Sequence, residues 1–274
     1  MAELLGRVVR IAPSRLPVLI TGETGTGKLT LARAIHSVSG RGPFMALSCA
    51  DLADTAAEAL LFGRQSARDG GGLLSQLAGG TLVLQNVEDL PGHLQPRLSR
   101  LLAEGAYVPL GGLRPVEVDL RVIATSQHEQ PDRVLRADFY HRLSGAVVNL
   151  PPLRQRQDLL WLARGLIQSA ARRRLEIAPE ILRAIAQHGW PGNLRELQFL
   201  ARRLALEATG GRLVSDPSVI GLVPAAPDAD TSTEALLLSR MLRETKGNIS
   251  ACARQLGVDR TTVHRRLKRF GLRH

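Results

Sequence analysis

The sequence predicts an α/β protein in which helices cover both faces of a parallel sheet, followed by a helical region and a small all-α domain. Short apolar runs alternate with helical patterns as far as Pro152, an order typical of a parallel sheet joined by crossover helices. Beyond Pro152 only helical spacing of apolar residues recurs. A linker rich in Pro, Ala and Asp at 223–232 then precedes a basic tail that also has helical patterns.

Five apolar runs are the predicted strands, at 18–21, 44–49, 81–87, 118–125 and 145–150. Helices are predicted between them at 29–39, 53–62 and 93–104. Past the double proline at 151–152, helices are predicted at 158–174, 179–188 and 193–209, with the segment WPGN at 190–193 forming the turn and cap before the last one. Ligands of open parallel sheets bind at the carboxyl ends of the strands, so a site is expected in the loops that follow them.

A glycine-rich loop follows the first predicted strand, in the segment VLITGETGTGKL at 18–29. Strand, glycine loop and helix in this order are typical of a phosphate-binding loop. The glycines bring backbone N–H groups against phosphate oxygens, the helix N-terminus adds its dipole, and Lys28 places a cation near the β- and γ-phosphates. Leu29 stands where a Ser or Thr hydroxyl usually reaches Mg²⁺. The predicted nucleotide-binding residues of this loop are Gly22, Glu23, Thr24, Gly25, Thr26, Gly27, Lys28 and Leu29.

Composition restricts the class of protein. The 274 residues include 36 Lys and Arg against 25 Asp and Glu, a formal net charge of +11 that points to nucleic acid as a partner. Residues 234–274 hold ten Lys and Arg against three Asp and Glu, so this tail alone carries 10 − 3 = +7. Cys49 and Cys252 lie far apart without metal-ligand neighbours, so they are interpreted as small buried residues and no metal site is predicted. The N-terminus lacks an h-region and no apolar run approaches membrane-spanning length, so we expect a soluble cytoplasmic bacterial protein without a membrane partner.

Taken in order, these pieces resemble the NtrC-type bacterial enhancer-binding proteins, which activate the sigma-54 RNA polymerase. The resemblance covers nearly the whole chain and depends on the motifs GETGTGK, LARAIH, PFMALSCADL, LFG, GGTLVL before EDLP, RVIATS, LRADFYHRL, LPPLRQR and GWPGNLREL. It implies a P-loop AAA+ α/β subdomain at 1–152, the AAA+ helical lid at 153–222, the linker at 223–232 and a Fis-type helix-turn-helix DNA-binding domain at 233–274. ATP or ADP is the implied ligand. The family lacks a Ser or Thr at the position of Leu29 and usually has Glu there, so the missing hydroxyl is no departure from it. Many relatives carry a sensor domain ahead of the ATPase domain, and none is expected here.

Two residues depart from the family where its Walker B strand ends in Asp-Glu. Gln85 and Asn86 take those positions. Neutral amides supply neither the negative charge that holds Mg²⁺ nor a base for the attacking water, so hydrolysis is expected to fall by orders of magnitude and the case for a bound Mg²⁺ is weak. Asp89 matches an additional acidic residue of the family and Glu88 lies beyond the predicted strand, so neither is expected to compensate.

Further departures concern the polymerase contact and the sensor. Between LFG and GGTL the family carries a loop with the sequence GAFTGA, which touches sigma-54. The segment 64–80, RQSARDGGGLLSQLAGG, is too short for this loop and contains nothing like it. Gln127 replaces the family's usual sensor Asn and presents its amide one methylene further out.

Three arginines match nucleotide-sensing groups of the family. Arg195 in GNLREL aligns with the sensor arginine of the lid. Arg136 and Arg142 in LRADFYHRL align with the arginine pair that reaches a neighbouring subunit's nucleotide. From the residues alone, each could equally be a solvated or ion-paired helix arginine.

The basic tail has the pattern of a helix-turn-helix. A helix at 249–256 ends at Gly257, and Asp259 caps a basic helix at 260–270. The predicted contacts to base edges are Arg260, Thr261, Thr262, His264 and Arg265, and the predicted phosphate contacts are Arg266, Lys268 and Arg269. Similar domains bind two-fold symmetric DNA as dimers, so at least a dimer is expected.

These observations lead to three hypotheses for the function. The first is a DNA-binding transcriptional regulator whose AAA+ domain is impaired in hydrolysis, serves nucleotide binding or oligomerisation, and acts independently of sigma-54. Its partners would be double-stranded DNA, further copies of itself in a dimer or ring, and the RNA polymerase holoenzyme. The alternatives are an active ATP-hydrolysing activator of the sigma-54 polymerase, or a regulatory subunit that co-assembles with an intact AAA+ paralogue.

Overall fold

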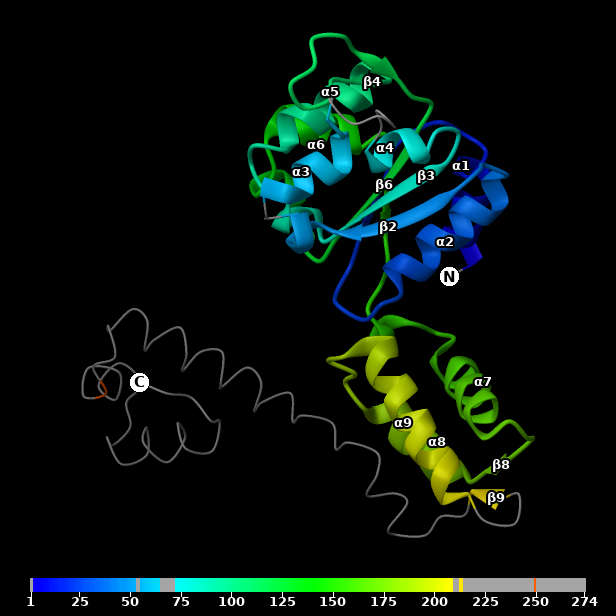
Figure 1. Cartoon of the computed structure of the whole chain (residues 1–274). Helices are drawn as coiled ribbons and strands as arrows, with labels where there is room; N and C mark the ends of the chain where they lie inside the picture. Colours follow the sequence, from blue (N-terminus) through cyan, green and yellow to red (C-terminus); the bar gives the residue numbers. More distant parts are fainter. Residues whose placement is uncertain (1, 53–54, 65–71, 209–211, 214–248, 250–274) are drawn as a thin grey trace. The chain divides into compact units, whose positions relative to one another are not determined.

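The structure, a computed structural model, describes residues 2–52, 55–64, 72–208, 212–213 and 249 (Figure 1). Its contacts divide the chain into two compact units, which are Met1–Leu175 with Trp190–Arg212 and Glu176–Gly189 with Leu213–His274. The first unit contains the sheet and the candidate site. In the second unit the described elements are β8 (Glu176–Ile177) and α8 (Pro179–Gln187). The short strand β9 (Arg212–Leu213) spans the boundary.

The sheet of the first unit has five parallel strands in the order β2-β3-β6-β1-β7. They are β1 (Val18–Thr21), β2 (Phe44–Ser48), β3 (Thr81–Gln85), β6 (Arg121–Ser126) and β7 (Ala146–Asn149). In β1, Val18 pairs with Ile123 of β6 on one side and with Ala146 of β7 on the other. After β1, which lies inside the sheet, the chain forms β2 at one edge. It then forms β3 and β6 and ends with β7 at the opposite edge, beside β1. The carboxyl end of β1 therefore lies where the strand order reverses, which is the usual ligand position in such sheets.

Helices cover both faces of the sheet (Figure 1). One face carries α1 (Ala2–Ile11) and α2 (Lys28–Ser39), and the other carries α3 (Thr55–Phe62), α4 (Leu73–Gln76), α5 (Gln95–Glu104) and α6 (Ala137–Leu143). The strand alternation explains both cores, because Val83 joins the cluster beneath α1 and α2 whereas Leu82 and Leu84 join the other. All three side chains are fully buried. A strand buried on both faces reads as a continuous apolar run, which is why the sequence pattern was informative.

The remaining elements of the first unit are short connections and two longer helices. β4 (Ala106–Tyr107) and β5 (Val116–Glu117) form an antiparallel ladder, and single 3-10 turns lie at η1 (Cys49–Leu52), η2 (Val87–Asp89), η3 (Pro131–Arg133) and η4 (Leu153–Gln155). Helices α7 (Leu159–Ala171) and α9 (Asn193–Glu207) pack against each other.

The predicted fold class is confirmed, and one predicted strand starts in the wrong place. The run 118–125 was predicted as a strand, but β6 begins at Arg121. The N–H of Val118 bonds instead to the carbonyl of Gly105 at 2.8 Å. Arg121, only 1% exposed, turns its guanidinium towards α1 and donates to the carbonyls of Ile11, at 2.9 Å, and Ala12. Carbonyls at a helix C-terminus lack helical partners and lie at the negative end of the dipole, so they accommodate this buried cation.

The predictions for the two cysteines, the basic tail and a membrane span have these outcomes. Cys49 is buried, as predicted, and burial raises the pKa of its thiol to about 12, so the thiol stays protonated at neutral pH. Cys252 and the helix-turn-helix prediction lie outside the described residues. In the part of the chain that the structure describes, no helix combines the length and apolar character that crossing a bilayer requires.

Candidate nucleotide-binding site

The loop between β1 and α2 has the backbone shape of a phosphate cradle. Gly22 and Gly25 have φ values of 145° and 80°, which side-chain-bearing residues rarely adopt. A Cβ on Gly25 would lie 2.3 Å from the carbonyl oxygen of Gly192, and one on Gly22 would lie 2.7 Å from that of Leu150. Glycine is therefore required here both by the backbone conformation and by the close approach of neighbouring chain.

Lys28 begins α2 and turns its ammonium back into this loop. Its Nζ donates to the carbonyl oxygen of Gly22 at 2.6 Å and to that of Glu23 at 3.0 Å. The pKa of Lys28 is lowered from its ordinary value, mainly because the ammonium is partly buried. The opposite charge of Glu88 offsets part of this shift. The loop thus holds the lysine through its own carbonyls, at the position where the sequence predicted the phosphate-binding cation.

A cavity of about 410 Å³ opens beside the loop, within the size range of small-molecule sites. Its walls come from the loop, the start of α2, the ends of β3 and β6, and the first two turns of α9. The lining residues are Thr24, Gly25, Gly27, Lys28, Leu29, Thr30, Gln85, Asn86, Thr125, Gln127, Leu194, Arg195 and Gln198. The structure therefore brings most of the predicted nucleotide-site residues to one place, although their roles there stay predictions.

Gln85 and Asn86 lie in this cavity at the carboxyl end of β3. Gln85 is the last residue of the strand, and Asn86 turns the chain with a φ of 53° and donates its backbone N–H to Thr125 Oγ1 at 3.2 Å. None of the lining residues is acidic. Among the described residues there is also no group of three His, Cys, Asp or Glu able to hold a metal ion. The lining therefore offers none of the carboxylate oxygens that proteins usually supply to Mg²⁺.

Glu88 connects the two strand ends from outside the cavity lining. Its Oε1 accepts the backbone N–H of Gln127 at 3.0 Å, and its Oε2 is buried with no hydrogen-bond partner among the described residues. Gln127 in turn accepts the hydroxyl of Thr24 on its Oε1 at 2.9 Å. No contact is predicted for Glu88 from the sequence, and in the structure it holds the backbone of Gln127, whose side chain contacts Thr24 of the phosphate loop.

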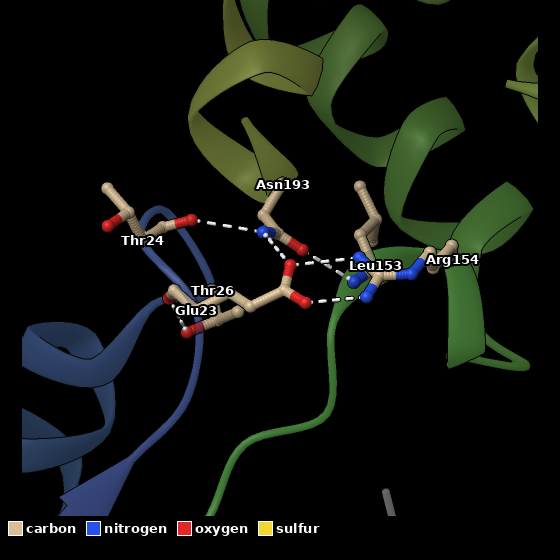
Figure 2. A network of polar contacts seen from close by, with 6 residues as sticks. All are labelled: Glu23, Thr24, Thr26, Leu153, Arg154 and Asn193. Carbon is tan, nitrogen blue, oxygen red and sulfur yellow. Dashed lines mark hydrogen bonds and ion pairs between the residues drawn. The ribbon is translucent and has the colours of Figure 1, made fainter. Parts of the chain in front are cut away.

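A second polar network joins the phosphate loop to the start of α9 (Figure 2). Two guanidinium nitrogens of Arg154 donate hydrogen bonds to the two carboxylate oxygens of Glu23, at 2.9 and 2.6 Å. Asn193 donates from Nδ2 to Glu23 Oε2 at 3.1 Å and to the carbonyl of Thr24 at 3.0 Å, and its Oδ1 accepts the N–H of Leu153 at 2.7 Å. These bonds link parts of the chain that are 131 and 170 residues apart.

The segment 190–193 forms the turn and cap before α9, as predicted. The N-cap of α9 is Gly192, which makes no side-chain cap bond, and Asn193 is already inside the helix with a φ of 52°. Its amide is fully buried in the network instead. Asn tolerates this conformation better than most residues, which fits its place at the turn into the helix.

The start of α9 also contacts the phosphate loop directly. The N–H of Leu194 donates to the carbonyl of Gly25 at 2.9 Å. The next residue, Arg195, is exposed, lines the cavity and lowers the pKa of Lys28 through its like charge. The position of Arg195 is compatible with the predicted contact to a nucleotide, which stays a prediction.

Arg136 and Arg142 lie away from this cavity, on α6. Arg136 is the N-cap residue, is exposed, and its Nε lies 3.1 Å from the carboxylate of Asp138. Arg142 is exposed in the last turn of the helix. Neither lines the cavity, so a contact with nucleotide would have to be to that of another subunit, as the resemblance implies. The eight predicted DNA-contacting residues at 260–269 lie outside the described residues.

Sequence comparisons define the class of protein. The profile of the sigma-54 interaction domain matches residues 1–149, that of the AAA+ ATPase lid domain matches residues 154–217, and that of the Fis family of bacterial regulatory proteins matches residues 232–270. Together with the sheet order and the glycine loop, they identify a P-loop AAA+ domain with its lid and a helix-turn-helix. The domain boundaries at 152, 222 and 232 stay predictions.

Individual relatives agree with this class. The acetoin catabolism regulatory protein of Cupriavidus necator is 41% identical over 302 residues, which cover 98% of this chain and 45% of that protein. NtrC of Escherichia coli K12 is 34% identical, over 99% of this chain and 69% of that protein. Crystal structures of NtrX from Brucella abortus in complex with ATP and with ADP have TM-scores of 0.70 at 31% and 30% identity, and cover 99% of this chain and 68% and 67% of those chains.

The chain belongs to the NtrC-type family of sigma-54 activators, which are transcriptional regulators with an AAA+ domain and a DNA-binding helix-turn-helix. It spans less than half the length of the acetoin regulator and about two thirds of the length of NtrC.

Proposed function

We propose that this protein is a DNA-binding transcriptional regulator whose AAA+ domain binds ATP or ADP and supports oligomerisation, is impaired in hydrolysis, and acts without sigma-54. One observation carries the proposal. The cavity keeps the phosphate loop and Lys28, but the strand end that should carry two acids presents the amides of Gln85 and Asn86. Nucleotide binding needs the first feature, whereas hydrolysis needs the second.

The chemistry of phosphoryl transfer explains why this matters. The reaction depends on positioning and on stabilising charge, with Mg²⁺ bridging phosphate oxygens and a carboxylate acting on the attacking water. An amide holds no negative charge at any ordinary pH and cannot accept a proton as a base. The relatives crystallised with ATP and ADP support nucleotide as the ligand of this cavity.

Independence from sigma-54 is supported by the segment 64–80, which lacks the GAFTGA motif of the family. The acetoin regulator aligns over 302 positions, more than the 274 residues of this chain, so that relative contains residues that have no counterpart here. A regulator of this kind would act on the ordinary RNA polymerase holoenzyme or block it.

DNA binding is proposed to depend on the basic tail, with dimers formed through the helix-turn-helix. The residues at 260–265 would contact base edges, and Arg266, Lys268 and Arg269 would contact phosphates. The tail charge of +7 and the Fis-family match at 232–270 support this assignment. Since chromosomal DNA would be the target, the proposed location is the bacterial cytoplasm.

The proposal is tested by steady-state phosphate release from the purified protein with ATP and Mg²⁺. We expect turnover near the background rate, and no recovery when DNA or a higher protein concentration is supplied. Robust Mg²⁺-dependent turnover would instead support the alternative of an active ATPase.

DNA binding is tested separately, by genomic footprinting and by titration at several salt concentrations. We expect specific sites and an affinity that falls steeply as salt rises, because phosphate contacts release counterions. Absent binding would favour the second alternative, a subunit that co-assembles with an intact AAA+ paralogue through surfaces such as the one that carries Arg136 and Arg142.

A further inference from the structure

The lining of the candidate nucleotide cavity has an unusual charge. Lys28 and Arg195 contribute two positive charges, and no lining residue contributes a negative one. We propose that this cavity takes the nucleotide as a metal-free polyphosphate anion, and binds it more tightly without Mg²⁺ than with it. The inference rests on the proposed function, since it concerns the ligand of the same cavity.

The charge balance is the first argument. Two carboxylates at positions 85 and 86 would offset the two cations, whereas two amides leave the lining at +2. A nucleotide polyphosphate carries two more negative charges when free than when it chelates Mg²⁺. A partly enclosed cationic cavity therefore attracts the free anion more strongly, and chelation removes the charge that the cavity is suited to bind.

The hydrogen-bonding groups are the second argument. An ionised carboxylate only accepts hydrogen bonds. It therefore contacts a phosphate oxygen indirectly, through a metal ion or a water molecule. An amide carries two N–H donors that can bind a phosphate oxygen directly. Gln85 and Asn86 lie at the end of β3 and line the same cavity as Lys28.

Glu88 is the carboxylate that could oppose this inference. It lies close enough to affect the pKa of Lys28, and one of its oxygens is buried without a hydrogen-bond partner among the described residues. Its other oxygen is bonded to the N–H of Gln127, and its side chain is not part of the cavity lining. Glu88 is therefore held by the backbone of Gln127 and is not among the side chains that would face a metal bound to phosphate in the cavity.

The experiment measures the affinity of the full-length protein for a fluorescent ADP analogue and a fluorescent, non-hydrolysable ATP analogue. Each is titrated with excess MgCl₂ and, at matched ionic strength, with EDTA. We expect the dissociation constant to be about 1.5- to 5-fold lower in EDTA, the range that loss of one partly exposed charge contact spans. The preference should be larger for the ATP analogue because its polyphosphate is longer.

Restoring the acids gives the matched variant. The double substitution Gln85→Asp with Asn86→Glu should reverse the preference, so that Mg²⁺ tightens binding, while the thermal unfolding midpoint confirms that the variant folds. Glu88→Gln should leave the wild-type preference for EDTA in place. A wild-type protein that binds more tightly with Mg²⁺, and loses this preference in Glu88→Gln, would show that Glu88 holds the metal and would overturn the inference.

The outcomes separate this inference from the proposed function. Binding of both analogues that is tighter with Mg²⁺ in the wild-type protein overturns the metal-free inference, and leaves nucleotide binding intact. Absence of binding under both conditions overturns both. Equal affinity under both conditions also contradicts the inference, because the charge argument predicts a difference.

Discussion

The two ends of the candidate site differ in what carries their chemistry. At the phosphate loop the groups that would meet a nucleotide are backbone N–H groups and Lys28, fixed by glycines that pack against the backbone of Leu150 and Gly192. At the ends of β3 and β6 they are neutral side chains, the amides of Gln85, Asn86 and Gln127 and the hydroxyl of Thr125. A backbone cradle is lost only when the fold changes, whereas a side-chain charge is lost by one substitution that leaves the strand intact. Binding and hydrolysis are therefore separable properties of this domain.

The largest effect is expected from Gly25→Ala. The new Cβ would lie 2.3 Å from the carbonyl of Gly192, at a φ of 80°. We expect a loss of about 2–4 kcal/mol in the free energy of unfolding and loss of nucleotide binding, because backbone must move on both sides of the contact. Chemical denaturation measures the first effect.

The matched control is Gly165→Ala in α7, where nothing lies within 4 Å of the new Cβ. It should be neutral or stabilising by about 0.5–1 kcal/mol, since Ala is the better helix former. Similar behaviour of both variants would contradict the view that close backbone approach fixes the loop.

The next effect is expected at the contact between the loop and α9. Asn193→Gly keeps the positive φ available but removes the amide, which leaves the N–H of Leu153 without its partner. We expect about 1–3 kcal/mol of destabilisation, the cost of an unsatisfied buried group. Urea denaturation measures it, with Asn193→Ala as the comparison, which should cost more because Ala disfavours this φ. An unchanged stability in both would mean that the network of Figure 2 contributes little.

Removing the cation at the loop should affect binding rather than folding. Lys28→Ala is expected to weaken binding of a fluorescent ATP analogue at least about tenfold, since it removes a charge-assisted contact to phosphate. Arg33→Ala, on the same helix but outside the cavity lining, should leave the affinity unchanged. Unaltered affinity in Lys28→Ala would remove this cavity from consideration.

The smallest effect is the pH dependence of the Glu23–Arg154 pair. The hydrogen bond from Arg154 lowers the pKa of Glu23 below its ordinary value of 4.5. The pair therefore stabilises the fold above pH 4.5, and this contribution is lost as the pH falls through the lowered pKa. Both side chains are about 40% exposed, so we expect well under about 1 kcal/mol. Denaturation curves at neutral and acidic pH should show this loss in the wild-type protein and not in Glu23→Gln.

Local patterns in the sequence were sufficient to predict most strands and helices of the first unit. The predicted strand at 18–21 matches β1, and the predicted helix at 29–39 matches α2 except for its first residue. The strand predicted at 118–125 began too early, because Val118 has the composition of a strand but bonds to Gly105. An apolar run does not reveal where its backbone partner begins.

Polar contacts between distant segments were not predictable in the same way. Arg154 and Asn193 lie inside the motifs LPPLRQR and GWPGNLREL, yet neither motif predicts a contact with Glu23. Glu88 was set aside as lying past the strand, and it in fact bonds to the residue after β6. Each of these contacts depends on which strands lie side by side, and hydrophobic periodicity carries no information about that order.

The sequence alone determined the fold class, the phosphate loop with its lysine, and the replacement of two acids by amides, because each is a local pattern or a single residue type. Only the tertiary structure decided that these amides share one cavity with Lys28 and Arg195, and that Glu23, Arg154 and Asn193 meet. The physical reason is the parallel sheet, whose crossovers bring the carboxyl ends of strands distant in sequence to one edge.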